Sequence, residues 1–249
     1  MAGFVLFFIC FYGEARGEGQ YAAFSLLAEG SADSWTVWSG EEGMPGGKGS
    51  GWDQSAWGPG GGGRLDYYSG GFNAGVEYQY GKGEFPTLGK STRHKYALDF
   101  SWMEGEQTVQ GAYLGIRYYD FKFAQPTSSL HNHDFVEFTL GYALEMNPTG
   151  QGPFYKARVS SPTLFWLTLL FLAAQDNNAV YLNDFPLPLG LDFQLDAGYR
   201  FGPMELGMGY RFLYYDTFYQ ANQDGYPLPM SGIVHGVFAR IKINLWLSL

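Results

Sequence analysis

Cysteine, long apolar runs and basic charge are all scarce in this chain of 249 residues. The single cysteine, Cys10, lies in a segment that we expect to be removed, so disulfides, thiolate metal sites and cysteine catalysis are excluded for the mature chain. The chain also lacks the several runs of about 20 apolar residues that an all-helical membrane protein needs. Its net charge of -9 excludes nucleic acid as a partner, because phosphate backbones are bound by basic surfaces.

The segment that we expect to be removed is residues 1–15. Residues 1–12 form an apolar stretch as long as the core of a signal peptide, and Gly13 and Ala15 place small residues at the positions that a signal peptidase reads. We therefore predict a secreted protein that is cleaved after Ala15.

Aromatic residues and glycine are abundant, and from Gly70 onward apolar and polar residues alternate one for one. Successive side chains of a β-strand point to opposite faces, so this pattern predicts strands with one apolar face. Seven segments carry the pattern: 72–80, 95–102, 111–119, 136–145, 189–201, 204–212 and 233–245. Their length matches that of a strand tilted across a bilayer.

Two regions follow this pattern less closely. An eighth strand is predicted in 153–172, although Ser161 and Pro162 would also begin a helix over 162–174, and 163–172 is apolar on both faces. We assign residues 16–69 to a glycine-rich extension or partial plug, because ten of the 21 residues from 43 to 63 are glycine. The sequence thus predicts eight strands in residues 70–249, with ten as the alternative if 16–69 adds a hairpin.

Short and long connections alternate between the predicted strands. Tight connections at 104–106, 147–152 and 202–203 separate longer ones, and 83–92 is expected to be the long connection of the first hairpin. Outer-membrane barrels have short periplasmic turns, longer outer loops and aromatic girdles at both interfaces. Large aromatic residues near the ends of the apolar faces fit such girdles: Tyr78, Tyr80, Tyr96, Trp102, Tyr118, Tyr142, Tyr199 and Tyr210. We therefore predict an all-β fold, an antiparallel up-and-down transmembrane β-barrel in the outer membrane.

The polar faces of these strands would point into the lumen, and they carry charges of both signs in nearly equal number. These residues are Glu77, Lys95, Asp99, Arg117, Glu137, Glu145, Lys156, Arg158, Asp192, Asp196, Arg200, Glu205, Arg211, Arg240 and Lys242. Side chains just fill an eight-stranded barrel, and charges buried there must be paired. The pattern favours a lumen closed by ion pairs, since a selective pore would show one dominant sign. A hydrated lumen that tolerates these charges is the alternative.

Two repeated units, 195–201 and 206–212, and the final segment 241–249 resemble the small bacterial outer-membrane barrels typified by OmpA, OmpX and OmpW. The resemblance covers residues 70–249 and is one of class, so no functional residue is carried over from it. It implies a Gram-negative bacterium, outer-membrane lipids and lipopolysaccharide as partners, and the barrel-assembly machinery during biogenesis. That machinery recognises a terminal strand, which here ends in Leu249 in place of an aromatic residue.

One predicted loop gathers residues that could carry chemistry. Ser128, His131, His133 and Asp134 could form a base-assisted nucleophile, and the last three could ligate a metal. A solvated loop explains the same residues more simply, so we expect no enzyme, no metal site and no cofactor. The predicted function is a structural barrel or a narrow passive pore. The alternatives are a channel for a small or apolar solute, with 163–172 lining its path, and a lipid A-modifying enzyme or protease at the rim.

Overall fold

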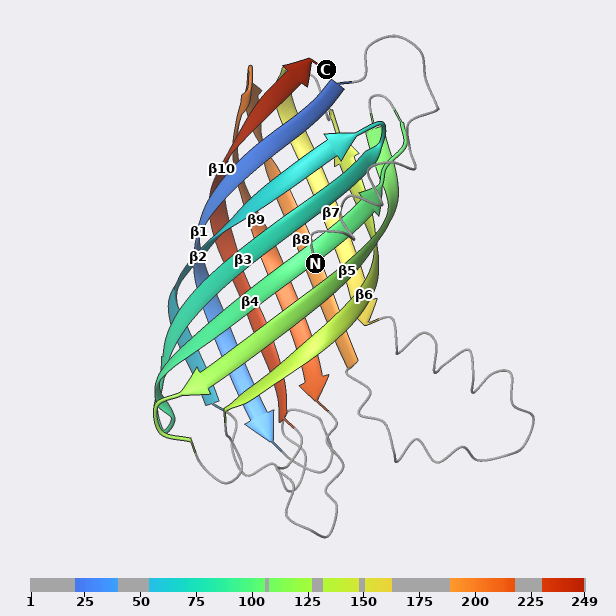
Figure 1. Cartoon of the computed structure of the whole chain (residues 1–249). Coiled ribbons are helices and arrows are strands. Elements are labelled where there is room, and N and C mark those ends of the chain that lie inside the picture. Colours follow the sequence, from blue (N-terminus) through green and yellow to red (C-terminus); the bar gives the residue numbers. More distant parts are fainter. Residues whose placement is uncertain are drawn as a thin grey trace, which may run out of the picture.

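The computed structural model describes residues 21–39, 54–105, 108–126, 132–147, 151–162, 189–217 and 230–248. In these ranges ten antiparallel strands form one closed barrel, in which each strand pairs with its sequence neighbours and the first pairs with the last (Figure 1). The strands are β1 (Tyr21–Ser39), β2 (Gln54–Ser69), β3 (Phe72–Phe85), β4 (Gly89–Trp102), β5 (Thr108–Phe123), β6 (His133–Met146), β7 (Gly152–Pro162), β8 (Leu189–Phe201), β9 (Met204–Thr217) and β10 (Met230–Ser248). The described ranges hold no helix long and apolar enough to cross a membrane.

The prediction of eight strands is wrong, and the ten-strand alternative is the observed one. Residues 21–39 and 54–69, which we had assigned to an extension or partial plug, form β1 and β2. β1 pairs with β10 along its whole length, from Tyr21 opposite Ser248 to Ser39 opposite Met230. The barrel is therefore closed by a strand from the very region that the sequence pattern had set apart.

The glycine-rich tract is ordered by its neighbours. Residues 58–63 lie within β2, and β1 and β3 pair with this strand on either side. A sheet in lipid must pair all its backbone groups, and that pairing holds a tract that has no side chains to pack. Glycine is also required by space, since a Cβ at Gly60 would lie 2.5 Å from Oγ of Ser31 and 2.8 Å from Oδ2 of Asp33.

The two ends of the barrel are named for the number of residues between successive strands. The end that we call the turn end holds the start of β1, the end of β10, residues 103–105 after β4 and the two-residue connections at 70–71 and 202–203 (Figure 1). The other end, which we call the loop end, holds the end of β1, the start of β10 and the connection at 86–88, while the longer gaps between strands at 40–53, 163–188 and 218–229 lie outside the described residues.

One connection at the loop end is shorter than predicted. The prediction of a long connection at 83–92 is wrong, because β3 continues to Phe85 and β4 begins at Gly89. The backbone N–H groups of Thr87 and Leu88 donate to Oε1 of Gln54 on β2, at 3.2 and 3.4 Å. Gly89 has a φ of 67°, a left-handed conformation that glycine adopts without steric cost, so the chain reverses over three residues.

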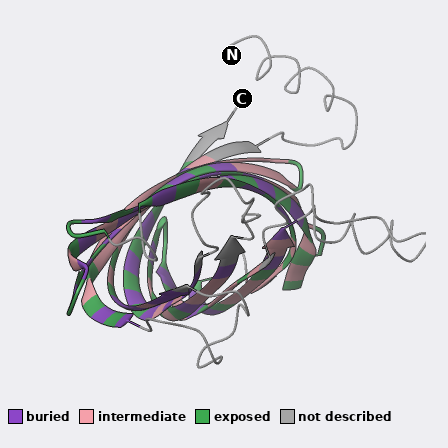
Figure 2. Cartoon of the chain, turned by 90° about the horizontal axis from the view of Figure 1, so that it is seen from below, coloured by how far each residue is buried: buried purple, intermediate pink, exposed green. Residues whose placement is uncertain are grey.

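Buried and exposed residues alternate along the strands, as the sequence pattern predicts (Figure 2). The outward faces are apolar, and exposed on them are Leu26, Leu65, Val76, Leu98, Ile116, Phe138, Leu195, Met208, Val237 and Ile241. On β3 this face runs from Phe72 to Tyr80, which is close to the ~9–11 residues of a tilted strand that crosses the hydrocarbon core. Lys82 and Glu84 continue the same face toward the loop end. β3 therefore extends beyond the apolar belt at that end.

Some predictions fall on residues that the structure does not describe. The predicted strand 153–172 is present as β7 only as far as Pro162. The apolar segment 163–172 and the alternative helix lie outside the described residues, as do the signal segment 1–15 and His131.

Candidate functional site: the lumen

Aromatic side chains fill the lumen near the loop end. Trp35 on β1 packs against Phe121 on β5 with ring centroids 5.3 Å apart, and Phe121 packs against Tyr215 on β9 at 4.8 Å. Neither pair lies on neighbouring strands, so these rings meet across the barrel. The cluster that they form is Trp35, Val37, Ala56, Phe85, Leu88, Tyr119, Phe121, Phe123, Tyr215 and Val234. All of its members are buried, so this end of the lumen is packed with apolar side chains.

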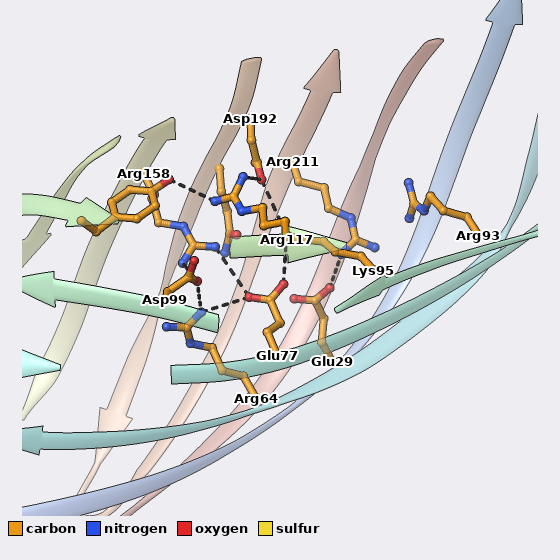
Figure 3. Close-up of polar contacts among 12 residues, drawn as sticks. Glu29, Arg64, Glu77, Arg93, Lys95, Asp99, Arg117, Arg158, Asp192 and Arg211 are labelled. Atoms are coloured by element: carbon orange, nitrogen blue, oxygen red, sulfur yellow. Dashed lines mark hydrogen bonds and ion pairs between the residues drawn. The ribbon is translucent and has the colours of Figure 1, made fainter. Parts of the chain in front are cut away.

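A second layer, nearer the turn end, is made of ion pairs that cross the lumen (Figure 3). Arg158 on β7 lies 3.4 Å from Asp99 on β4 and 3.6 Å from Glu77 on β3. Asp192 on β8 lies 2.7 Å from Arg117 on β5 and 3.6 Å from Lys95 on β4. No two strands joined by these contacts are neighbours in the sheet, so the side chains bridge opposite walls.

Arg64 on β2 is the hub of this central layer. Its guanidinium lies 2.6 Å from Asp99, 2.7 Å from Asp66 and 3.1 Å from Glu77. A planar guanidinium offers five N–H donors in a fixed arrangement, so one arginine can bind several carboxylates at once. Asp66 makes no ion pair with any other described residue, and its further contact is a hydrogen bond from Ser25.

Between the aromatic cluster and the central layer lies a third group of charges. Arg211 binds Glu29 at 2.6 Å and Asp33 at 2.9 Å, and Arg93 binds the same Asp33 at 2.9 Å. The void next to this group measures about 20 Å³, which holds roughly one water molecule. In the described part of the chain, side chains therefore fill much of the lumen between the central layer and the loop end.

At the turn end the charges line the wall and leave the centre open. Glu205 lies 2.8 Å from Arg200 and 3.2 Å from Lys156, and Arg240 binds Asp196 at 2.7 Å. These pairs join strands that are adjacent or nearly so, from β7 to β10. They border a cavity of about 1090 Å³, which we call the vestibule.

Beside the vestibule, aromatic rings that point into the lumen pack on glycines of the neighbouring strands. The Tyr113 ring would be only 2.4 Å from a Cβ at Gly141, and the Phe154 ring 2.7 Å from one at Gly198. Phe154 is completely buried, and three cations lie over its ring at 5.0 to 5.7 Å. Glycine on the inward face is thus what lets large rings and long charged side chains share a narrow lumen.

The structure places all the predicted lumen charges on the inward faces. Ion pairs are formed by Glu77, Asp99, Arg117, Lys156, Arg158, Asp192, Asp196, Arg200, Glu205, Arg211 and Arg240. Glu137 and Lys242 are buried but form no ion pair with any described residue. Lys95 and Glu145, which completed the predicted set of lumen charges, are paired as well.

Sequence reasoning missed five charges of the lumen: Glu29, Asp33, Arg64, Asp66 and Arg93. The first four lie on β1 and β2, which we had placed outside the barrel. A signal was present, since Glu29, Ser31 and Asp33 alternate with small residues in the way that strand residues do. Arg93 was missed because it adjoins the segment that we had read as a loop.

Of the loop cluster that could have carried chemistry, the structure describes His133 and Asp134, while Ser128 and His131 lie outside the described residues. His133 and Asp134 are consecutive residues of β6, so they point to opposite faces of the sheet. His133 is buried in the lumen and stacks on Phe121 at 4.7 Å, whereas Asp134 lies outside and accepts a hydrogen bond from Tyr118. These two residues therefore do not share a metal ion or form a catalytic pair. No group of three or more potential metal ligands occurs among the described residues.

Comparison with known proteins gives the class of fold. No protein-family model and no curated protein sequence matches this chain. Among solved structures, the outer membrane protease OmpT from Escherichia coli aligns over 94% of this chain and 99% of its own, with a TM-score of 0.51 and 6% identity. The chain has the fold of an outer-membrane β-barrel.

Other matched structures belong to the same class. They include Neisserial surface protein A (91% of this chain and 99% of that one, TM-score 0.36, 12% identity). The toluene transporter TodX of P. putida is another (94% and 91%, TM-score 0.28, 8% identity). At these identities the likeness concerns the fold alone, so function has to be argued from the lumen.

Proposed function

We propose that this protein is an outer-membrane barrel whose lumen is closed, with a structural role and no through-path for solutes. The observation that carries this proposal is the layer of ion pairs that joins non-neighbouring strands, above all Arg158 with Asp99 and Arg117 with Asp192. A cation channel or an anion channel would leave one sign of charge free to bind the ion. Here each of these charges is held by its opposite, and the aromatic cluster lies between this layer and the loop end.

The outward face supports residence in the outer membrane. Its apolar belt would contact lipid, and the tyrosines at its border on the loop-end side would lie at the headgroups. Tyr78, Tyr96 and Tyr118 follow one another across β3, β4 and β5 in direct register. Outer-membrane lipids and lipopolysaccharide would be the partners of this face, and the barrel-assembly machinery would act on β10 during biogenesis.

The alternative functions have less support in the geometry. A channel for a small or apolar solute would have to pass both the central layer and the aromatic cluster. An enzyme at the rim would need a catalytic group other than the pair His133 and Asp134, which β6 separates. That the protein is not an enzyme stays a prediction.

Conductance in planar bilayers tests the closed lumen. We expect no steady openings from the wild-type protein, nor from Arg158→Ala alone, because Asp192 with its cations and the aromatic cluster still block the path. The fourfold variant R158A/D192A/F121A/Y215A weakens both layers, and its openings would show that the assay detects a passage. Steady wild-type openings above leak would contradict the proposal, provided that heat-modifiable mobility shows every sample to be folded.

A further inference from the structure

The vestibule has the form of a pocket. Its lining includes Gly70, Gly105 and Pro203 from three connections of the turn end, so it opens there. Toward the middle of the barrel it reaches Arg64, Glu77, Asp99 and Arg158, the ion pairs that cross the lumen. Its volume of about 1090 Å³ compares with ~300–1,000 Å³ for sites that bind small molecules. A cavity of this size with a charged floor is suited to hold a ligand.

Lys242 is the cation of the vestibule lining that has no described carboxylate in ion-pair contact. The other lysines and arginines of its lining, Arg64, Lys156, Arg158, Arg200 and Arg240, each have a carboxylate in ion-pair contact. Lys242 is only 6% exposed, and among described residues its ammonium contacts the hydroxyl of Tyr68, at 2.8 Å. Glu205 stands opposite Lys242 in the strand register, yet its oxygens bind Lys156, Arg200 and Asn244.

The chemistry at Lys242 fits a carboxylate. An ammonium has three N–H donors, and one of them is given to the hydroxyl of Tyr68. That hydroxyl accepts from Lys242 and so keeps its own hydrogen for a second acceptor. A buried ammonium with no carboxylate in ion-pair contact is unfavourable, and an incoming anion would reduce that cost. Two donors on the nitrogen and one on the phenol match the two oxygens of a carboxylate.

The opposite wall of the vestibule carries apolar side chains beside Glu145, whose carboxylate is paired with Lys156 and Arg200. Lys242 and Tyr68 lie on β10 and β2, which flank β1, while Met103, Val109 and Ala143 line the cavity near β4, β5 and β6. In a ring of ten strands β6 lies opposite β1, so the two sets face each other across the cavity. A ligand held by its carboxylate at Lys242 would therefore meet apolar side chains on its far side.

We propose that the vestibule binds a small carboxylate with an apolar body, its carboxylate on Lys242 and Tyr68. The inference rests on the closed lumen of the proposed function, since an open lumen would make the vestibule part of a passage. Conductance tests the closure and a binding titration tests the site, so the failure of one is distinguishable from the failure of the other.

The probe is 4-fluorobenzoate, followed by 19F NMR with the full chain in nanodiscs of zwitterionic lipid. We expect saturable binding by the wild type and no saturable binding of the uncharged 4-fluorobenzamide. K242Q should weaken benzoate binding about tenfold or more, the usual loss when a hydrogen bond to a charged group is removed. Y68F, which keeps the ring and the lysine, should weaken it by a smaller factor. K122Q is the matched control, because Lys122 is an exposed lysine near the loop end, paired with Asp120, and its loss should leave binding unchanged.

Three results would overturn the proposal: no saturable binding by the wild type, equal binding by K242Q, or equal binding of the amide. Heat-modifiable mobility reports whether each variant is folded. If K242Q does not fold, Y68F decides in its place, since it leaves every charge of the lumen intact. Unchanged affinity in Y68F would then reject the site.

Discussion

Arg64 is the side chain whose loss should disturb the lumen most. In R64M, Glu77 keeps Lys95 at 3.1 Å and Asp99 keeps Arg158 at 3.4 Å, but Asp66 loses its ion pair. Breaking a buried ion pair from one side costs ~3–5 kcal/mol, because the remaining charge is left uncompensated. The Arg64 side chain is 12% exposed and borders the open vestibule, where water can solvate part of that charge. We therefore expect the low end of this range, a loss of about 3 kcal/mol in the free energy of unfolding.

Urea unfolding from lipid vesicles, followed by tryptophan fluorescence, measures this loss. The matched control is K122M, which removes a lysine that is 62% exposed and bound to Asp120 at 2.8 Å. An exposed pair contributes ~0–1 kcal/mol, so this variant should unfold almost like the wild type.

A second variant separates charge from packing. R64M/D66N removes the arginine together with the carboxylate that depends on it, so it should recover much of the lost stability. If R64M costs less than about 1 kcal/mol, or if the double variant is no more stable than R64M, the reasoning about a buried, mutually paired layer is refuted.

Two further predictions concern the inward glycines and the lipid face. G141A should cost about 1–3 kcal/mol in the same assay, because its Cβ would lie 2.4 Å from the Tyr113 ring, whereas G30A, with no atom within 4 Å of its Cβ, should be nearly neutral. Equal effects of the two variants would disprove the close packing of rings on glycine. M208R should cost ~2–4 kcal/mol in a bilayer, since Met208 is 71% exposed on the apolar belt, while K82M beyond the belt should cost little. A harmless M208R would count against a membrane-spanning belt.

The alternation of apolar and polar residues along the chain predicted most of the strands. The outward residues meet lipid and the inward residues meet one another, so most strands from β3 onward show two distinct faces in the sequence, and β7 shows them less clearly. β2 broke the rule in the stretch 58–63, where glycine on both faces erases the pattern. Its order comes from backbone pairing to β1 and β3, which no local signal reports. The strand count was wrong for that reason.

For the lumen charges too, the sequence shows one property and the tertiary structure another. Their inward direction follows from strand parity, so in each recognised strand the sequence by itself determined which residues face the lumen, and it indicated the near balance of charge. Which charge meets which was decided only in the tertiary structure, because Arg158 finds Asp99 across the lumen, 59 positions away in the chain. The same is true of Arg64 as the hub, of Lys242 with no described carboxylate in ion-pair contact, and of His133 and Asp134 on opposite faces. Sequence parity fixes a side of the sheet, but closure of the barrel brings distant strands face to face, and that closure sets the contacts of the lumen.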